Sequence, residues 1–474
     1  MDAETRPAIL WLRRDLRITD HLALASAARQ RTPVIPVYVV STWRDNHAWT
    51  GDKRQHFLCE CLASLAHSLE QLGGRLIIRR GDPVAEIETL ASETGAASVH
   101  FTLDPDPFGR STETRLRESC RRLKLECHGH HDTTLHQPDE ILNQSGRPYR
   151  VFTPYLKNWL SRPKVPPLKA PREIHTPAGI HSLPLPTLAS WDLPPLHATL
   201  PAAGEKAAKA RLRNACSKLI QHYDARRDFP GLDATTRISQ DLRFGLLSIR
   251  TVYQTAVRAR QSASPAAAAS IDTFISELAW REFYFAILHH FPDILNTEFN
   301  PNWRGIPWRE PGPGFDAWKS GCTGFPIVDA GMRELLATGF MHNRVRMITA
   351  MFLTKDLHLD WKLGESHFMR HLIDGEIASN NGGWQWSAGT GADAAPYFRI
   401  QNPWSQSARY DSDGTYIKKW IPELAGTHPS QFHQAPKTGT PIASGYPLPI
   451  LDHNTERKVT LDIFKRHREQ TNHQ

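Results

Sequence analysis

The sequence contains no apolar run close to the ~18 residues that a membrane-spanning helix needs, so we expect no membrane segment. Its first seven residues, Met1 to Pro7, include no apolar signal region, and secretion is not indicated. The six cysteines form no CxxC pair, which is typical of reduced thiols in a cytoplasmic protein. The 24 histidines form no HExxH pattern, and we predict no metal site.

Two common enzymatic signatures are also missing. No GxGxxG follows the first apolar segment, which argues against NAD binding there. No Ser/His/Asp or Cys/His arrangement indicates a nucleophilic mechanism. The sequence is instead rich in positive charge and in tryptophan: the net charge is +8, and 14 of the 474 residues are tryptophan. The charge favours an anionic partner, and the tryptophans indicate that an aromatic function has to be considered.

The order of sequence patterns predicts an α/β domain followed by a larger all-helical domain. Apolar segments at 7–12, 33–40, 75–79 and 98–102 are typical of buried parallel strands. Asp20 is expected to cap a helix that starts at His21, and Gly73-Gly74 to end a helix over 53–72. Ten prolines between Arg162 and Ala202 make regular structure improbable there, and helical patterns dominate from Glu205. We therefore place an α/β domain at 1–135, a connector at 136–204 and a helical domain at 205–474.

Two helical motifs carry unusual combinations of side chains. In Ser276–Tyr284, the helix period puts Glu277, Trp280 and Arg281 on one face. This face offers an acceptor, a stacking plane and a cation, although a half-buried Trp beside a surface ion pair would look the same. In Met341–Met347, Asn343 and Met347 are i, i+4 neighbours. Asn343 could alternatively be only a helix cap.

The segment from Leu372 to Trp386 combines charge, amides and indoles. A buried Asp374 needs a cation, and Arg346 is the candidate. Asn380 follows six residues later and could lie across the same ring-shaped ligand. Amides can read the edges of flat heterocycles, and an Arg/Asp pair can lie beside a charged ring, so these residue types fit a flavin site that also handles a nucleobase.

Hydroxyl side chains gather in Thr235-Thr-Arg-Ile-Ser239. Hydroxyls and backbone N–H groups near a helix start can hold phosphate, although ordinary helix capping explains them equally well. Three tryptophans, Trp308, Trp361 and Trp384, could likewise be separate core residues.

Long, ordered motifs give these segments a common interpretation. They run from Leu10-Trp-Leu-Arg-Arg-Asp15 through Asp374–Trp386 to Ala395-Pro-Tyr-Phe-Arg-Ile-Gln-Asn-Pro403. Over nearly the whole chain the sequence resembles the DNA photolyase/cryptochrome family, and most closely the class I photolyases that act on cyclobutane pyrimidine dimers. The resemblance implies a Rossmann-like antenna domain and a helical domain that binds FAD and damaged DNA.

The resemblance implies roles for individual residues. FAD contacts are expected from Tyr223, Thr235, Thr236, Arg237, Ile238, Ser239, Glu277, Arg281, Arg346, Asp374, Gly375, Glu376 and Asn380. The dimer is expected to meet Glu277, Trp280, Asn343, Met347 and Trp386, with Asn380 near N5 of the flavin. Further DNA contacts are expected from Arg227, Arg281, Arg344, Arg399 and Gln401. An electron-hopping chain would run from Trp384 through Trp361 to Trp308 at the surface.

The implied reaction is light-driven. Reduced anionic FAD would donate one electron to the dimer and recover it after the ring opens, so no net redox change occurs. The substrate would be UV-damaged DNA, double- or single-stranded, and the protein a cytoplasmic monomer. Two departures from the family pattern stand out. Glu376 replaces the usual Asp, and the Glu of a folate-binding Asn-Glu pair is missing near Pro107–Arg110. A deazaflavin or flavin antenna is therefore favoured over folate, and an antenna could also be lacking.

Three alternative functions fit parts of the sequence. A cryptochrome would sense light without repair, but the sequence ends soon after Arg457, without a long signalling tail. A (6-4) photolyase would use two pocket histidines, whereas His342 is followed here by Asn343. A cofactor-free basic helical module that binds nucleic acid would leave the Asp374–Trp386 segment without a purpose.

Overall fold

The computed structural model describes residues 6–29, 32–42, 49–196, 198–437 and 439–471. The chain divides into two compact units. Unit 1 comprises Met1–His222 and Thr236–Pro292, and unit 2 comprises Tyr223–Thr235 and Asp293–Gln474. Helices before and after position 205 belong to the same unit as the sheet. The division into compact units therefore does not reproduce the predicted domain boundary at 204/205. The domain limits of the sequence analysis stay a prediction.

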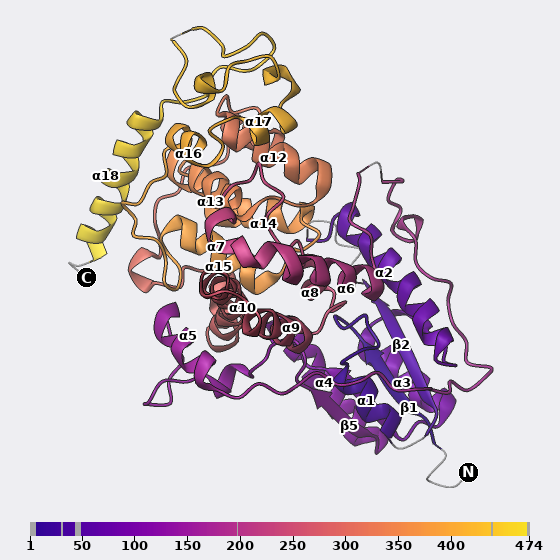
Figure 1. The fold of residues 1–474 in the computed structure, drawn as a ribbon. Helices are drawn as coiled ribbons and strands as arrows, with labels where there is room; N and C mark the ends of the chain where they lie inside the picture. Colours follow the sequence, from indigo (N-terminus) through magenta and orange to yellow (C-terminus); the bar gives the residue numbers. More distant parts are fainter. Residues whose placement is uncertain (1–5, 30–31, 43–48, 197, 438, 472–474) are drawn as a thin grey trace. The chain divides into compact units, whose positions relative to one another are not determined.

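Unit 1 is built on a five-stranded sheet in which every neighbouring pair is parallel (Figure 1). The spatial order is β3-β2-β1-β4-β5, so the direction of strand addition reverses next to β1. Four strands match the predicted apolar segments, whereas the fifth was missed. The strands are β1 (Ala8–Leu12), β2 (Val34–Ser41), β3 (Ile77–Gly81), β4 (Ser98–Thr102) and β5 (Glu126–His130).

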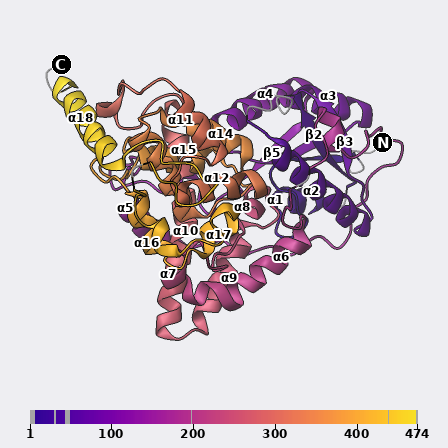
Figure 2. The ribbon, with the colours of Figure 1, turned by 90° about the horizontal axis from the view of Figure 1, so that it is seen from above.

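Helices cover the sheet, as its apolar strands require (Figure 2). Alternate strand residues such as Ile9, Val37 and Phe101 form one apolar cluster with residues of α3 and α4. Helix α1 packs against β1, β4 and β5 instead. The helices are α1 (Leu22–Arg29), α2 (Asp52–Gln71), α3 (Pro83–Thr94) and α4 (Pro107–Leu123).

Two expectations about helix ends had different outcomes. Helix α2 ends at Gln71, and Gly73 adopts φ 84°, so the predicted glycine stop is confirmed. The predicted Asp20 cap is wrong, because the Nδ1 atom of His21 accepts the N–H of Leu24 at 3.2 Å. The Asp20 carboxylate is instead bound by Arg250 at 2.9 Å and by the hydroxyl of Ser248.

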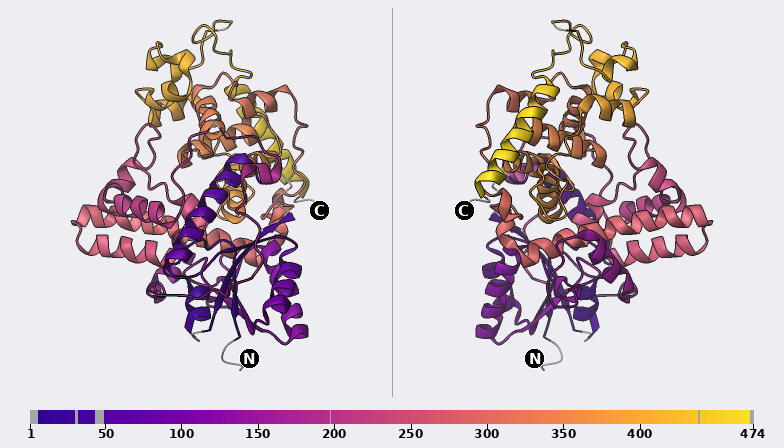
Figure 3. Two further views of the ribbon diagram at one scale, coloured as in Figure 1. Left: turned by 90° about the vertical axis from the view of Figure 1, so that its right-hand side faces the viewer. Right: turned by 90° about the vertical axis from the view of Figure 1, so that its left-hand side faces the viewer.

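The rest of unit 1 consists of helices and one long irregular segment. From Arg162 to Ala202 the described residues contain one short helix, η4 (Leu188–Trp191), in keeping with the many prolines. The longest helix, α10, packs along α9, and the two lie side by side in Figure 3. These elements are η3 (Pro138–Glu140), α5 (Phe152–Ser161), α6 (Glu205–Asn214), η5 (Ala215–Leu219), η6 (Ile220–His222), α8 (Ser239–Arg243), α9 (Ile249–Gln261) and α10 (Pro265–His290).

Unit 2 consists of helices around one apolar cluster that includes Trp318, Trp361 and Trp384. The main helices are α7 (Tyr223–Arg226), α11 (Pro313–Ser320), α12 (Pro326–Thr338), α13 (Asn343–Met351), α14 (Trp361–His371), α15 (Ile377–Ala388), α16 (Pro403–Tyr410), α17 (Thr415–Trp420) and α18 (His453–Thr471). A π-helix, η9 (Phe352–Asp356), directly continues α13. Among the residues that the structure describes, no helix combines the length and apolarity needed to span a bilayer.

Candidate functional site

The expected ion pair in unit 2 is present. The Nη2 atom of Arg346 donates to both carboxylate oxygens of Asp374, at 2.9 and 3.2 Å. The Nε atom of the same guanidinium donates to the Met341 carbonyl oxygen at 2.7 Å. The Asp374 side chain is 4% exposed and that of Arg346 25% exposed, so the pair has a buried anion and an accessible cation edge. Helix α13 and the segment before α15 are thereby fixed to each other.

The start of α13 is held by further polar contacts. Glu334 on α12 accepts the backbone N–H of His342 at 3.1 Å and the hydroxyl of Tyr416 at 2.7 Å. His342, not Asn343, caps the helix, because its Nδ1 accepts the N–H of Arg344 at 3.2 Å. Asn343 is the first helical residue and is exposed, so its amide is available to a ligand. Met347 lies one turn further and is half-buried.

On α15, Asn380 is oriented by an acidic residue that the sequence analysis missed. Its Nδ2 donates to the backbone oxygen of Glu365 at 3.0 Å, which leaves its carbonyl oxygen for another partner. The neighbouring Asn381 donates to the Glu365 carboxyl at 3.1 Å. Burial raises the pKa of Glu365 to about 8, so this carboxyl is mostly protonated near neutral pH. Only the fold reveals the contact, because Glu365 lies on α14.

The three tryptophans of the expected electron chain all belong to or pack against the same apolar cluster. Trp361 and Trp384 are buried, and Trp308 is partly buried. Within the described part of the chain, no ring contact joins the three to one another. Trp384 instead meets Phe368 at 4.9 Å and Trp318 at 6.1 Å between ring centroids. Trp318 was not singled out from the sequence, and the hopping chain stays a prediction.

Helix α10 in unit 1 carries Glu277, Trp280 and Arg281 on one face, as the helix period predicts. Trp280 has one ring face covered by Phe152, with centroids 3.7 Å apart and planes 12° apart. Arg281 donates to the Thr133 carbonyl oxygen at 2.9 Å, and burial lowers its pKa to about 10. Arg281 is half-buried, and the hydrogen bond to Thr133 uses one of its five N–H donors, so its predicted contacts to FAD and DNA stay a prediction.

The hydroxyl-rich segment Thr235–Ser239 retains hydrogen-bonding capacity. Across the described ranges, no protein group binds the hydroxyls of Thr235, Thr236 or Ser239. Arg237 adopts φ 52°, and its carbonyl oxygen accepts the side-chain amide of Gln240 at 2.6 Å. Ile238 is buried and anchors the segment. This geometry is compatible with phosphate binding but does not by itself identify it.

The proposed DNA-facing cations of unit 2 differ in how they are engaged. Arg344 pairs with Asp228 at 2.8 Å and lies over the Tyr410 ring at 4.6 Å. Arg227 lies over the Tyr223 ring at 5.5 Å. Arg399 is exposed, beside the exposed Phe398.

The remaining predicted residues lie close to these in the sequence. Gln401 is half-buried, as is Trp386 on α15. Glu376, at the N-cap of α15, is buried, and Gly375 directly precedes it. The predicted roles of Gln401, Trp386, Gly375 and Glu376 in binding DNA or FAD stay predictions.

The carboxyl ends of β1 and β4 show a different chemistry. Open α/β sheets often bind ligands where the strand order reverses. Here Arg13 pairs with Glu113 at 2.6 Å, and Arg14 with Asp104 at 3.0 Å. Burial alone would raise the pKa of Asp104, but Arg14 and Arg13 lower it to about 2. These charges satisfy one another, so this edge of the sheet gives no independent support for an antenna ligand.

The residues of the helical part suit FAD. In unit 2, Arg346 and Asp374 supply charge and Asn380 supplies an amide oxygen, which suits the ring of a flavin. In unit 1, considered by itself, the hydroxyls of Thr236 and Ser239 have no protein partner across the described ranges, which suits a phosphate. The histidine and carboxylate groups of the described residues form one cluster with metal-like spacing, Asp139 with His289 and His290.

Comparison with known proteins gives the same interpretation. Residues 8–173 match the family model for DNA photolyase, and residues 274–466 match the FAD binding domain of DNA photolyase. A deoxyribodipyrimidine photo-lyase of Synechococcus is 40% identical, with 95% of each chain covered. That of Agrobacterium fabrum is 38% identical, with 98% of each covered.

Solved structures agree with the fold. A class III photolyase of Agrobacterium tumefaciens has a TM-score of 0.91 at 35% identity, covering 99% of both chains. A Synechocystis cryptochrome has a TM-score of 0.89 at 29% identity, covering 98% of this chain and 100% of that one. An archaeal photolyase of Sulfolobus tokodaii, with two FAD molecules, has a TM-score of 0.84 at 28% identity, covering 97% and 100%.

Three observations identify the same family: the α/β and helical architecture, the match to an FAD-binding domain and the full-length similarity to photo-lyases. The chain belongs to the DNA photolyase family, is an enzyme of the deoxyribodipyrimidine photo-lyase type, and uses FAD as its cofactor.

Proposed function

We propose that this enzyme repairs cyclobutane pyrimidine dimers in UV-damaged DNA when light excites its reduced, anionic FAD. The observation that carries the proposal is the composition of helix α13. Its first turn presents the exposed amide of Asn343, and Arg346 in the same turn is paired with Asp374. One rigid element therefore carries a group suited to a pyrimidine edge and a cation suited to a reduced flavin ring.

The chain supplies binding, orientation and charge stabilisation. In unit 2, the amide of Asn343 would hydrogen-bond the dimer, and Met347 and Trp386 would contact its apolar faces. On α10 of unit 1, Glu277 offers a hydrogen-bond acceptor and Trp280 a stacking plane. Preorganised polar groups of this kind stabilise charge that appears during reaction, without the reorganisation that water needs. Arg346 and Asp374 would hold the flavin ring, and Asn380, whose amide nitrogen donates to the Glu365 carbonyl oxygen, would offer its own oxygen to the ring. Bound FAD supplies the light-driven electron that opens the cyclobutane ring and then returns.

Damaged DNA is bound mainly through its phosphates, and the dimer leaves the helix to be repaired. Extrusion costs least where base pairing is already damaged, and photolyases are a standard example of it. Arg227, Arg344 and Arg399 are the proposed phosphate contacts, and Arg344 would exchange its Asp228 partner for a phosphate. Binding should weaken as salt concentration rises. We propose that the protein acts as a cytoplasmic monomer on double- or single-stranded DNA.

The test is repair of a dimer-containing oligonucleotide. FAD-loaded, reduced protein is illuminated with this substrate, and recovery of the pyrimidine absorbance is followed against a dark control. Recovery only in the light supports the proposal. No recovery despite bound, reduced FAD would contradict it.

A second candidate, light sensing without repair, is favoured by one observation: the similarity to the Synechocystis cryptochrome. Normal flavin photoreduction together with no recovery in the same assay would support it. A (6-4) photoproduct oligonucleotide tests the remaining repair alternative. The class I assignment and the identity of an antenna, with flavin or deazaflavin ahead of folate, stay predictions.

A further inference from the structure

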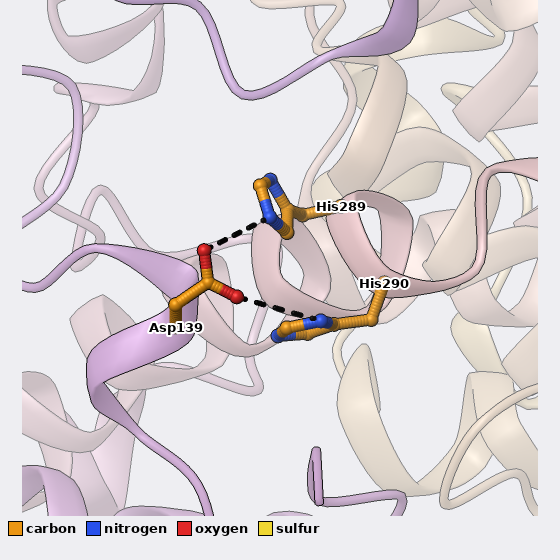
Figure 4. Close-up of side chains that lie close together, drawn as sticks. All are labelled: Asp139, His289 and His290. Carbon is orange, nitrogen blue, oxygen red and sulfur yellow. Dashed lines mark ion pairs between the residues drawn. The ribbon is translucent and has the colours of Figure 1, made fainter.

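The end of helix α10 and the short helix η3 bring together two imidazoles and a carboxylate that have no part in the proposed reaction. Figure 4 shows the Asp139 carboxylate between the rings of His289 and His290. One ligand-type atom from each of the three residues lies within 4.8 Å of the others. All three residues belong to unit 1.

The separations between the rings and the carboxylate exceed those of good hydrogen bonds. Nε2 of His289 lies 3.4 Å from Oδ2 of Asp139, and Nδ1 of His290 lies 3.9 Å from Oδ1, so each ring faces a different carboxylate oxygen. Zinc–ligand bonds of about 2.1 Å at tetrahedral angles place neighbouring ligand atoms about 3.4 Å apart. A rotation of the Asp139 carboxylate that brings one oxygen toward both rings would let the three side chains meet one cation.

The hydrogen bonds around His290 leave the correct nitrogen available. Its Nε2 lies 3.3 Å from the carbonyl oxygen of Pro138, which can only accept a hydrogen bond. The proton of a neutral ring is therefore on Nε2, and the lone pair of Nδ1 points toward the Asp139 carboxylate. Two acceptors that face each other favour a cation between them. A backbone carbonyl that orients the distal nitrogen is also typical of metal-bound histidine.

The local electrostatics contain one favourable and one opposing contribution. His289 and His290 end a 26-residue helix, whose C-terminal end carries partial negative charge. Arg110 opposes a cation, since its Nη1 lies 3.4 Å from Nδ1 of His289 and adds positive charge. Because a guanidinium can only donate, the proton of a neutral His289 ring is on Nε2, and a bound cation would displace this proton. The same Nη1 donates to the backbone carbonyl oxygen of His289 at 3.0 Å.

We propose that Asp139, His289 and His290 form a binding site for a divalent transition cation of the zinc type. Nε2 of His289, Nδ1 of His290 and one Asp139 oxygen are the protein ligands, and water completes a four-coordinate site. The cation would tie η3 to the end of α10. No metal was predicted because no HExxH pattern organises the histidines. This site could not be found in that way, since Asp139 and the two histidines are about 150 positions apart.

The test uses the FAD-containing protein, stripped of metal with a chelator and titrated with Zn²⁺ and, separately, Co²⁺. We expect one Zn²⁺ per chain, a rise in thermal midpoint, and a visible Co²⁺ spectrum of nitrogen and oxygen ligands. His289→Gln, His290→Gln and Asp139→Asn should each bind at least about tenfold more weakly. Arg110→Gln should bind more tightly, because a like charge is removed.

His128→Gln is the matched control. It also removes one surface histidine of unit 1 that lies beside a carboxylate, here Glu126 at 2.9 Å. Its binding should equal that of the parent protein. The proposal is overturned by no binding, by binding that survives in both His289→Gln and His290→Gln, or by a Co²⁺ spectrum with sulfur charge-transfer bands. The metal spectrum of the parent protein remains a valid readout even where a variant folds poorly.

Discussion

Two buried Arg–Asp systems, one in each unit, use the same residue types for different purposes. In unit 1, Asp20 is bound by Arg250, the Ser248 hydroxyl and the Leu168 N–H, and Arg250 also reaches Asp132. In unit 2, within the described ranges, Asp374 is bound by Arg346 alone. The first system is saturated by protein groups, and the second retains capacity for a ligand. Unused hydrogen-bonding capacity, not burial or charge, therefore distinguishes a site from a structural ion pair.

The largest expected effect concerns the saturated system. Asp20→Ala leaves Arg250 buried with one carboxylate fewer, which should lower the free energy of unfolding by about 3–5 kcal/mol. Asp272→Ala is the control, because its pair with Arg260 at 2.6 Å is about half exposed, and it should cost at most about 1 kcal/mol. Urea unfolding measures both. Equal losses would mean that saturation does not matter.

Lys355 extends the comparison to a buried cation that has no paired carboxylate in the described part of the chain, and its effect on stability depends on pH. Lys355 has no carboxylate partner among the described residues; its Nζ lies 3.3 Å from the Tyr397 carbonyl oxygen and 4.2 Å from the Phe464 ring centroid. Burial lowers the pKa of Lys355 from 10.5 to about 7. Between these values the unfolded chain binds the extra proton, so the free energy of unfolding rises with pH.

Lys355→Met should therefore reduce this rise, and it should stabilise the protein most at the lower end of the window. Urea unfolding of both proteins at about pH 7 and about pH 9 checks the difference. If the variant and the parent gain the same stability between the two pH values, the amine titrates normally and is not desolvated.

The packing around Trp384 gives a smaller expected effect. A Cβ atom at Gly364 would lie 2.0 Å from the Trp384 ring, so Gly364→Ala must displace the indole. We expect a loss of about 1–3 kcal/mol and slower photoreduction of oxidised FAD. Gly383→Ala is the matched control, because nothing lies within 4 Å of its added methyl group. Similar photoreduction in the two variants would remove Trp384 from the electron path.

Trp308→Phe tests the other end of the same path. Phenylalanine keeps the apolar contact with Phe464 but is much harder to oxidise than an indole. Photoreduction of oxidised FAD should slow, whereas repair by enzyme reduced beforehand should not change. Flavin absorbance during illumination measures the first, and the dimer assay the second. An unchanged photoreduction rate would exclude Trp308 as a carrier.

Local patterns predicted the elements and pairings that depend on nearby residues. Four strands were found because their apolar, β-branched residues identify them, whereas β5 was missed because Glu126-Cys-His-Gly-His130 has no such pattern. The Arg346–Asp374 pair was predicted, since a buried carboxylate needs a cation and the family resemblance pointed to Arg346. The family resemblance, not spacing, supplied most other site residues.

Long-range partners could not be predicted in this way. Asp20 was expected to cap a helix, but Arg250, 230 positions later, binds it instead. Asp228 engages Arg344, Thr133 engages Arg281, and Glu365 orients Asn380, each through contacts that only the fold creates. Such partners decide whether a charged side chain is available to DNA or to FAD.

The central claim is that α13 joins recognition of the lesion to the flavin, and Asn343→Ala tests it most directly. Repair of a dimer-containing oligonucleotide by reduced, FAD-loaded enzyme under light should fall about tenfold, the loss of one hydrogen bond of ~1.4 kcal/mol. The flavin spectrum and FAD content should stay unchanged, because Arg346 and Asp374 are intact. Repair at the parental rate with FAD bound would contradict the account.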